Sequence, residues 1–260
     1  MPPILTEIER ARLREYLLET LLAGPTKTTR ANAVRNAELL AAGDPDKMLG
    51  FSYDGLDSQE VMDAVAELCG CSPSLAEREG PGYIDPDRTL DELETMAARL
   101  ALAARRGERV LLCTGHPTGP LALYMAVSRA LADAGCKILT PREGERLAHD
   151  SRGRKLRVIY PDGVGVVSDG ASQRHSHSGD PMTALLEAGE PPDLVMADHG
   201  FAGAAIEHGL EVIGFNDIND PALAVAKARR KIEVLVPLDD NVPPRLYEPL
   251  AEVLVRAIRH

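Results

Sequence analysis

The sequence predicts an α/β fold: a mostly parallel, twisted sheet with helices on both faces, a β-hairpin insertion and an N-terminal helical cap. Two observations indicate this class. Apolar residues at helical spacing fill the first hundred positions, and from residue 108 onward short apolar runs alternate with helical stretches. Such alternation is typical of parallel strands joined by crossover helices. We expect residues 1–107 to form the cap, packed on the sheet rather than folded apart, and residues 108–260 to carry the site.

Helical periodicity dominates the N-terminal region. In residues 4–22, apolar Ile8, Leu13, Leu17 and Leu21 recur close to the period of an α-helix. The expected helices are 4–22, a second one from the Thr28-Thr29 cap to Gly43, 58–69 and 87–106, which ends at Gly107.

Two stretches rich in turn formers, 44–57 and 70–86, are expected to be loops. Residues 44–57 and 75–88 either fold over a substrate or are ordinary solvated loops. The side chains in or beside them that would reach a substrate are Lys47, Tyr83, Asp85 and Arg88.

The second half of the chain reads as alternating strands and helices. The expected strands are 109–113, 137–140, 194–197, 212–215 and 232–236. The expected helices are 121–134, 201–208, 221–230 and 244–258. Residues 155–168 predict an antiparallel hairpin around Pro161-Asp162-Gly163.

Composition excludes several classes of partner. The 260 residues carry a net charge of −11, with 3% aromatic residues and no Trp, which disfavours nucleic acid and anionic lipid. No apolar run approaches the roughly 20 residues that span a bilayer, and the charged start lacks a signal-peptide pattern. We therefore expect a cytoplasmic protein whose four cysteines are thiols. A homodimer remains open.

A glycine-containing loop follows the strand 109–113. In open α/β sheets, ligands bind at the carboxyl ends of the strands. The loop leads into a helix, whose N-terminus favours an anion. We expect Thr114, Gly115, Thr118 and Gly119 to bind a phosphate through this loop, and His116 to donate to a phosphate oxygen or protonate a leaving group. A tight turn with a capping Thr is the structural alternative.

A histidine pair follows the predicted hairpin. In an extended segment, His175 and His177 point to the same side, as two ligands of one metal do. A carboxylate from Asp169, Asp198 or Asp217 would complete a nitrogen and oxygen shell for a divalent ion such as zinc, manganese, iron or magnesium. The alternatives are two neutral donors for an anion, or two surface histidines without a role.

Acidic residues follow the next two strands. Asp198 and His199 are expected to act as a base and its orienting partner, unless Asp198 only caps the following helix. Asp217 is expected to be catalytic and Asn219 to bind substrate. Asp220 precedes a Pro and is expected to be a structural N-cap.

The segments CTGHPTGPL, SDGASQRHSHS, ADHGFAGAAIEHG and FNDINDPALAVA together resemble a family of uncharacterised bacterial phosphatases of actinomycete type. The resemblance covers most of residues 80–245. It implies hydrolysis of a phosphate ester and treats the four loops as one site, and it brings no established catalytic residue with it.

These patterns predict a phosphomonoester hydrolase for a small phosphorylated metabolite, with or without a divalent metal. A metal-free isomerase or lyase acting on a sugar-phosphate or carboxylate is one alternative. A non-catalytic metabolite- or nucleotide-binding protein is the other.

Overall fold

The computed structural model describes residues 4–149 and 155–260 and has the expected α/β fold. Five parallel strands form the centre of the main sheet, in the spatial order β10, β9, β8, β3 and β7. Their bounds are β3 (Arg109–Cys113), β7 (Val164–Ser168), β8 (Leu194–Ala197), β9 (Val212–Asn216) and β10 (Val234–Pro237). β7 to β10 are buried along their whole length, as expected for strands covered on both faces.

The β7 edge of the sheet carries the predicted hairpin. β6 (Lys155–Ile159) pairs antiparallel with β7 across the short turn η1 (Pro161–Gly163), and β5 (Arg146–His149) pairs with β6. β4 (Lys137–Ile138) lies parallel to the start of β3.

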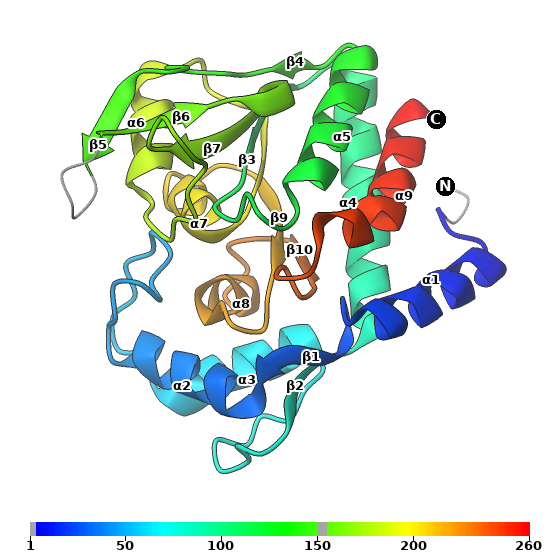
Figure 1. Ribbon diagram of the computed structural model, residues 1–260, viewed down its shortest axis with the longest axis vertical. Helices are drawn as coiled ribbons and strands as arrows, with labels where there is room; N and C mark the ends of the chain where they lie inside the picture. Colours follow the sequence, from blue (N-terminus) through cyan, green and yellow to red (C-terminus); the bar gives the residue numbers. More distant parts are fainter. Residues whose placement is uncertain (1–3, 150–154) are drawn as a thin grey trace.

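Helices cover both faces of the sheet (Figure 1). On one face, α4 contacts β10 and α9, and α5 contacts β3. On the other face, α7 contacts β8 and β9 and lies between α6 and α8. The bounds are α4 (Pro86–Arg106), α5 (Leu121–Asp133), α6 (Asp180–Ala188), α7 (His199–Glu207), α8 (Pro221–Ala228) and α9 (Glu248–Arg259), with η2 (Pro244–Tyr247) before α9.

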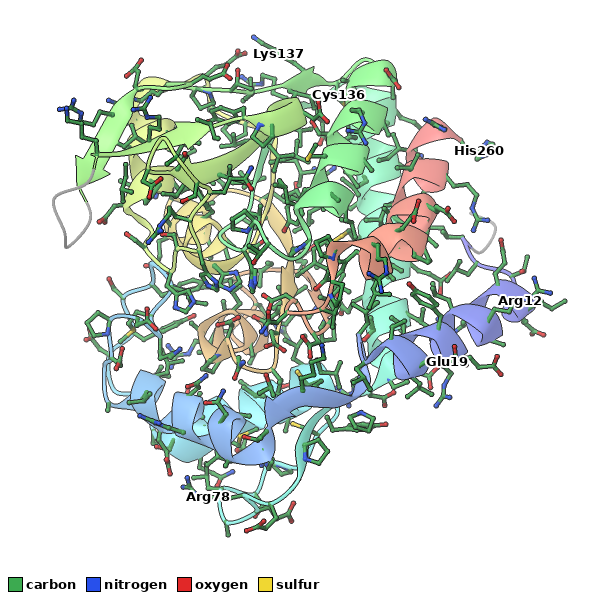
Figure 2. The ribbon with its side chains drawn as sticks, viewed as in Figure 1. Arg12, Glu19, Arg78, Cys136, Lys137 and His260 are labelled. Carbon is green, nitrogen blue, oxygen red and sulfur yellow. The ribbon has the colours of Figure 1, made fainter. Side chains whose placement is uncertain are left out.

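The N-terminal elements pack around this body. α2 (Arg30–Ala41) and α3 (Ser58–Cys69) contact α8, while α1 (Glu7–Thr20) contacts α4. Arg12 and Glu19 project outward from α1 (Figure 2). The Thr29 side chain caps α2 and Gly107 ends α4, as the sequence predicts. The division of the chain at residue 107 stays a prediction.

Two pairs of elements were not expected. β1 (Gly24–Thr29) and β2 (Pro81–Ile84) form a small antiparallel sheet where a helix end and a loop were predicted. β5 and α6 also lie in stretches to which the sequence assigned no element. β2 has only four residues and pairs with β1, which lies far away along the chain. Local periodicity in the sequence therefore does not predict this strand.

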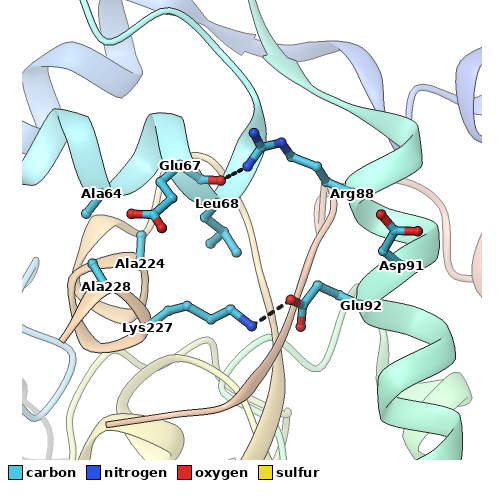
Figure 3. A pocket seen from close by; sticks show the side chains of 9 residues that line it. All are labelled: Ala64, Glu67, Leu68, Arg88, Asp91, Glu92, Ala224, Lys227 and Ala228. Carbon is cyan, nitrogen blue, oxygen red and sulfur yellow. Dashed lines mark hydrogen bonds and ion pairs between the residues drawn. The ribbon is translucent and has the colours of Figure 1, made fainter. Parts of the chain in front are cut away.

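A charged cavity of about 450 Å³ lies between α3, α4 and α8 (Figure 3). Its charged groups are held in place: the Lys227 ammonium binds Glu92 at 2.6 Å, and Arg88 donates to the Glu67 carbonyl. None of the residues predicted to bind a phosphate or a metal lines it.

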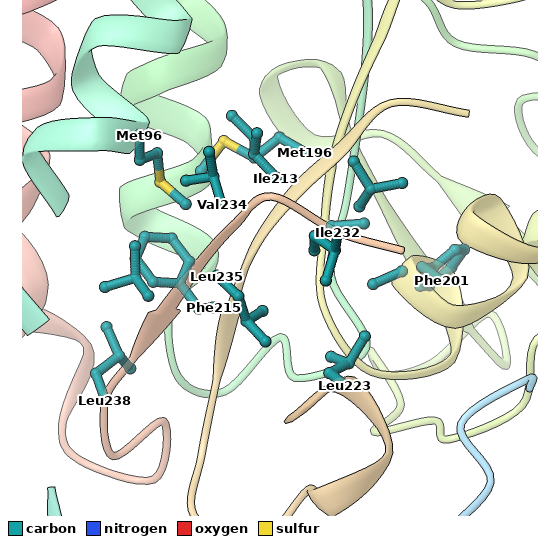
Figure 4. Close-up of a cluster of buried hydrophobic side chains, with 14 of the residues drawn as sticks. Met96, Met196, Phe201, Ile213, Phe215, Leu223, Ile232, Val234, Leu235 and Leu238 are labelled. Atoms are coloured by element: carbon teal, nitrogen blue, oxygen red, sulfur yellow. The ribbon is translucent and has the colours of Figure 1, made fainter. Parts of the chain in front are cut away.

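The core joins both halves of the chain. Met96 of α4 packs on one side of β9 and β10, and Phe201 of α7 and Leu223 of α8 pack on the other (Figure 4). All three side chains are buried. None of the helices in the described ranges is long and apolar enough to cross a membrane.

Candidate functional site

The carboxyl ends of the parallel strands meet at one edge of the sheet. Cys113, the last residue of β3, lies opposite Ala197, the last residue of β8, and Asn216 of β9 lies opposite Pro237 of β10. The residues that follow these strands are therefore neighbours, whatever their separation in the sequence.

Four histidines gather at this edge. The ring centroids of His116 and His175 are 4.5 Å apart, those of His175 and His199 are 4.9 Å apart, and those of His177 and His199 are 5.3 Å apart. Segments following β3, β7 and β8 thus supply one imidazole cluster.

Two overlapping groups in this cluster have the geometry of metal ligands. The first contains His116, His175 and His199, and the second contains His177, His199 and Asp220. Within each group the ligand atoms lie within 4.8 Å of one another. His199 is common to both groups, so it stands at the centre of the site.

His199 is held tightly in an uncommon backbone conformation. Its φ is +48°, in the left-handed region that non-glycine residues rarely occupy. The Asp198 carboxylate accepts both the Gly115 N–H, at 2.7 Å, and His199 Nδ1, at 2.8 Å. Nε2 of the same ring then faces Asp220 at 3.4 Å and Asp240 at 3.6 Å.

These carboxylates control the charge of His199. Burial alone would lower the pKa of His199, but Asp220, Asp198 and Asp240 outweigh it and raise the pKa to about 10. In the metal-free protein the ring is therefore a cation near neutral pH.

This raised pKa predicts how the stability of the metal-free protein depends on pH. A folded-state pKa above the ordinary 6.5 contributes stability that is complete below about pH 6.5 and is lost as the pH rises towards about 10. The free energy of unfolding of wild type relative to His199→Asn should therefore decrease over this range. Urea unfolding of both chelator-treated proteins at several pH values measures it, and a constant difference would contradict the assignment.

The pKa values of His175 and His116 shift in opposite directions. Burial and then the neighbouring imidazoles lower the pKa of His175 to about 4, so this ring is neutral at pH 7 and keeps a lone pair for a ligand. Burial opposes protonation of His116, but Asp240, whose Oδ1 lies 3.3 Å from His116 Nδ1, raises its pKa.

Backbone N–H groups of the loop after β3 have partners within the protein, and phosphate binding by this loop stays a prediction. The N–H groups of Gly115, His116 and Gly119 donate to Asp198, to the Thr114 hydroxyl and to the His116 carbonyl, so these donors are already engaged within the protein. The Thr114 hydroxyl accepts the His116 N–H and closes a tight turn, which is the structural alternative that the sequence offered. The side chain of Thr118 is exposed.

Close packing explains why the loop contains glycines. A Cβ on Gly115 would lie 2.6 Å from the Ser176 carbonyl oxygen, and a Cβ on Gly119 would lie 2.1 Å from that of Asp240. Glycine lets backbones approach here, but the backbones belong to the protein itself.

Two acidic residues after β9 have partners that the sequence did not predict. Asp220 is the N-cap residue of α8 with Pro221 after it, as the sequence predicts, but its side chain makes no cap hydrogen bond within the described chain and faces His199 instead. Asp217 accepts the Ile218 N–H and is buried. Burial, followed by Asp240, raises the pKa of Asp217.

Asn219 and Asp169 also have structural partners. The Asn219 side chain binds the amides of Asn32 and Asn36 and the Thr28 hydroxyl, which ties the loop after β9 to the N-terminal region. Asp169 accepts N–H groups of its own turn. It belongs to neither group of candidate metal ligands found among residues 4–149 and 155–260.

Sequence reasoning assigned no site role to Asp46 or Asp240. The signal for Asp240 was present, because it closely follows β10. Asp46 gave no such signal, yet its carbonyl lies 2.9 Å from His177 Nδ1. Of the four loop residues predicted to reach a substrate, Lys47 lies beside this site through its contact with Asp46. Asp85 caps α4, Arg88 lines the cavity of Figure 3, and Tyr83 is exposed in β2.

Two comparisons with known proteins show the family of this chain. A family described as Phosphatase matches residues 8–260. The chain is also 41% identical over 261 residues to "Phosphatase SCO2771" from Streptomyces coelicolor, with 97% of each chain covered. On both grounds the chain belongs to this phosphatase family.

Proposed function

We propose that this protein is a metal-dependent phosphatase that hydrolyses a small phosphorylated metabolite. The observation that carries the proposal is the convergence of four imidazoles and the Asp220 carboxylate at the carboxyl edge of the sheet. Neutral imidazole and carboxylate are the ligands that zinc and manganese prefer among these residue types.

The hydrogen bonds of two histidines fit a metal site. His199 Nδ1 binds the Asp198 carboxylate, and His177 Nδ1 binds the Asp46 carbonyl. Metal-ligating histidines usually donate one ring N–H to an oxygen in this way, which fixes the other nitrogen as the ligand. We therefore assign His177, His199 and Asp220 as the ligands and leave His116 and His175 to face the substrate.

A divalent ion in this site would polarise a phosphoryl oxygen and lower the pKa of a water molecule. The residues of the chain supply the proton chemistry. Asp240 raises the pKa of His116 against the effect of burial, which favours the protonated ring as the donor of a proton to the leaving oxygen. His175 is neutral and can orient the attacking water.

The carboxylates behind the imidazoles position them. Asp198 holds the His199 ring, and Asp240 stays ionised because His116 and His199 lower its pKa against the effect of burial. Asp217 is buried like the other carboxylates and its charge interacts with that of Asp240, so we give it a positioning role rather than one on the substrate.

A reconstitution experiment tests this function. The protein is stripped with a chelator, reloaded with zinc, manganese or magnesium, and assayed on a panel of phosphomonoesters, with bound metal measured by mass spectrometry. We expect hydrolysis of at least one ester, lost on chelation and restored by one of the ions. Hydrolysis that survives complete removal of metal would refute the metal's role, and no turnover by any loaded form would refute the phosphatase.

A further inference from the structure

The candidate site gathers several buried carboxylates, whose negative charge repels a phosphorylated substrate. Asp198, Asp220 and Asp240 are buried around His199, and Asp217 and Asp239 lie close behind them. A phosphate ester is itself an anion and is repelled by this cluster. A side-chain cation at the mouth of the site would offset the repulsion.

Lys47 is such a cation. Its side chain is only 16% exposed, and its ammonium lies 3.3 Å from Asp46 Oδ2. The other oxygen of the same carboxylate lies 3.1 Å from His177 Nδ1. One carboxylate therefore bridges the ammonium and a candidate metal ligand.

Lys47 comes from a loop that lies far from β8 and β9 in the sequence. The Asp46 carboxylate nevertheless links its ammonium to His177 at the carboxyl edge of the sheet.

The segment after Lys47 is packed against the helix that begins with His199. A Cβ on Gly203 of α7 would lie 1.8 Å from the Leu49 carbonyl oxygen. A Cβ on Gly50 would lie 3.1 Å from the Gly200 carbonyl oxygen and from Gly179 Cα. Backbone contacts this close hold the loop at a fixed place, so Lys47 is positioned before substrate arrives.

We propose that Lys47 binds the phosphate group of the substrate at the mouth of the imidazole cluster, with Asp46 holding its ammonium in place in the free protein. The inference rests on the proposed function and names the side chain that binds the phosphate group of the substrate. The N–H groups of Gly115 and His116 already donate to protein oxygens, so the phosphate group needs a different donor.

The test is binding of inorganic phosphate, measured by titration calorimetry, together with steady-state hydrolysis of 4-nitrophenyl phosphate. The variants are Lys47→Met and Lys47→Arg. Lys137→Met is the matched control, because it removes a lysine whose ammonium pairs with Glu190 at the far edge of the molecule (Figure 2).

For Lys47→Met we expect phosphate to bind roughly tenfold to hundredfold more weakly, the change that loss of one charge-assisted hydrogen bond produces. KM should rise more than kcat falls. Lys47→Arg should recover most of the affinity, since it keeps the cation, and Lys137→Met should match wild type. An unaltered melting temperature shows that the variants are folded.

The outcomes separate this inference from the proposed function. Equal phosphate affinity and KM in wild type and Lys47→Met, with wild type still hydrolysing the ester, would overturn the role of Lys47 alone. Lysine-dependent phosphate binding without turnover of 4-nitrophenyl phosphate or of any phosphomonoester in the panel would overturn the phosphatase and support the anion site. Wild type that neither binds phosphate nor hydrolyses an ester would overturn both.

Discussion

Replacing His199 by Asn is expected to lower kcat/KM for ester hydrolysis by about three orders of magnitude, because the variant loses the residue shared by both groups of candidate ligands. Asn is among the few residues that tolerate a left-handed backbone, so the φ of +48° at this position need not change. The amide cannot place a nitrogen where Nε2 faces Asp220 and Asp240.

Kinetics of the zinc- or manganese-loaded variant, with bound metal measured in parallel, check this expectation. His208→Asn is the matched control, since His208 is exposed just beyond the other end of α7 and its Nδ1 bonds only to the Ala204 carbonyl among the described residues. The control should keep wild-type activity and metal content. Activity of His199→Asn within tenfold of wild type would remove the imidazole cluster from the mechanism.

The general location of the site could be predicted from the sequence without knowing the order of the strands in the sheet. Any parallel strand delivers the residues after it to the same edge, so His116 and His199 meet once 109–113 and 194–197 are recognised as strands. The sequence also predicts that His175 and His177 share a segment. The structure brings all four rings together, and their catalytic roles stay predictions.

Side-chain direction within each loop could not be predicted. Asp217 and Asp220 lie three residues apart after β9, and the Asp-Pro pattern favoured a cap at Asp220. In the structure it is Asp217 whose carboxylate accepts a neighbouring N–H, and Asp220 that turns towards His199. The difference depends on the path of the loop, which contacts with Asn32 and Asn36 fix from outside.

The group that approaches each loop glycine could not be predicted from the sequence either. A glycine in a loop indicates a close approach of some group to the backbone, but not which group. Gly115 and Gly119 predicted an approaching anion, whereas carbonyls of Ser176 and Asp240 occupy that space. Likewise, nothing local in 44–57 indicates that Asp46 contacts His177, a partner 131 residues away.

Gly203→Ala is expected to damage both stability and activity, because the glycine lies where α7 meets the loop that carries Asp46 and Lys47. The new Cβ would lie 1.8 Å from the Leu49 carbonyl oxygen, a backbone atom that cannot rotate away. Forced repacking of this kind lowers the free energy of unfolding by about 1–3 kcal/mol. The better helix propensity of Ala raises it by at most about 1 kcal/mol.

The expected loss of activity follows from the same displacement. A shift of Leu49 moves Asp46, whose carbonyl orients His177, and changes of this kind behind a metal ligand typically cost about 10- to 100-fold. Urea unfolding and steady-state kinetics measure the two effects. Gly189→Ala is the control: its Cβ would meet Pro141 Cβ at 3.0 Å, away from the site, so activity should stay at the wild-type level. Wild-type stability and turnover in Gly203→Ala would show that the loop is not held against α7, and that Lys47 lacks the fixed position on which phosphate binding depends.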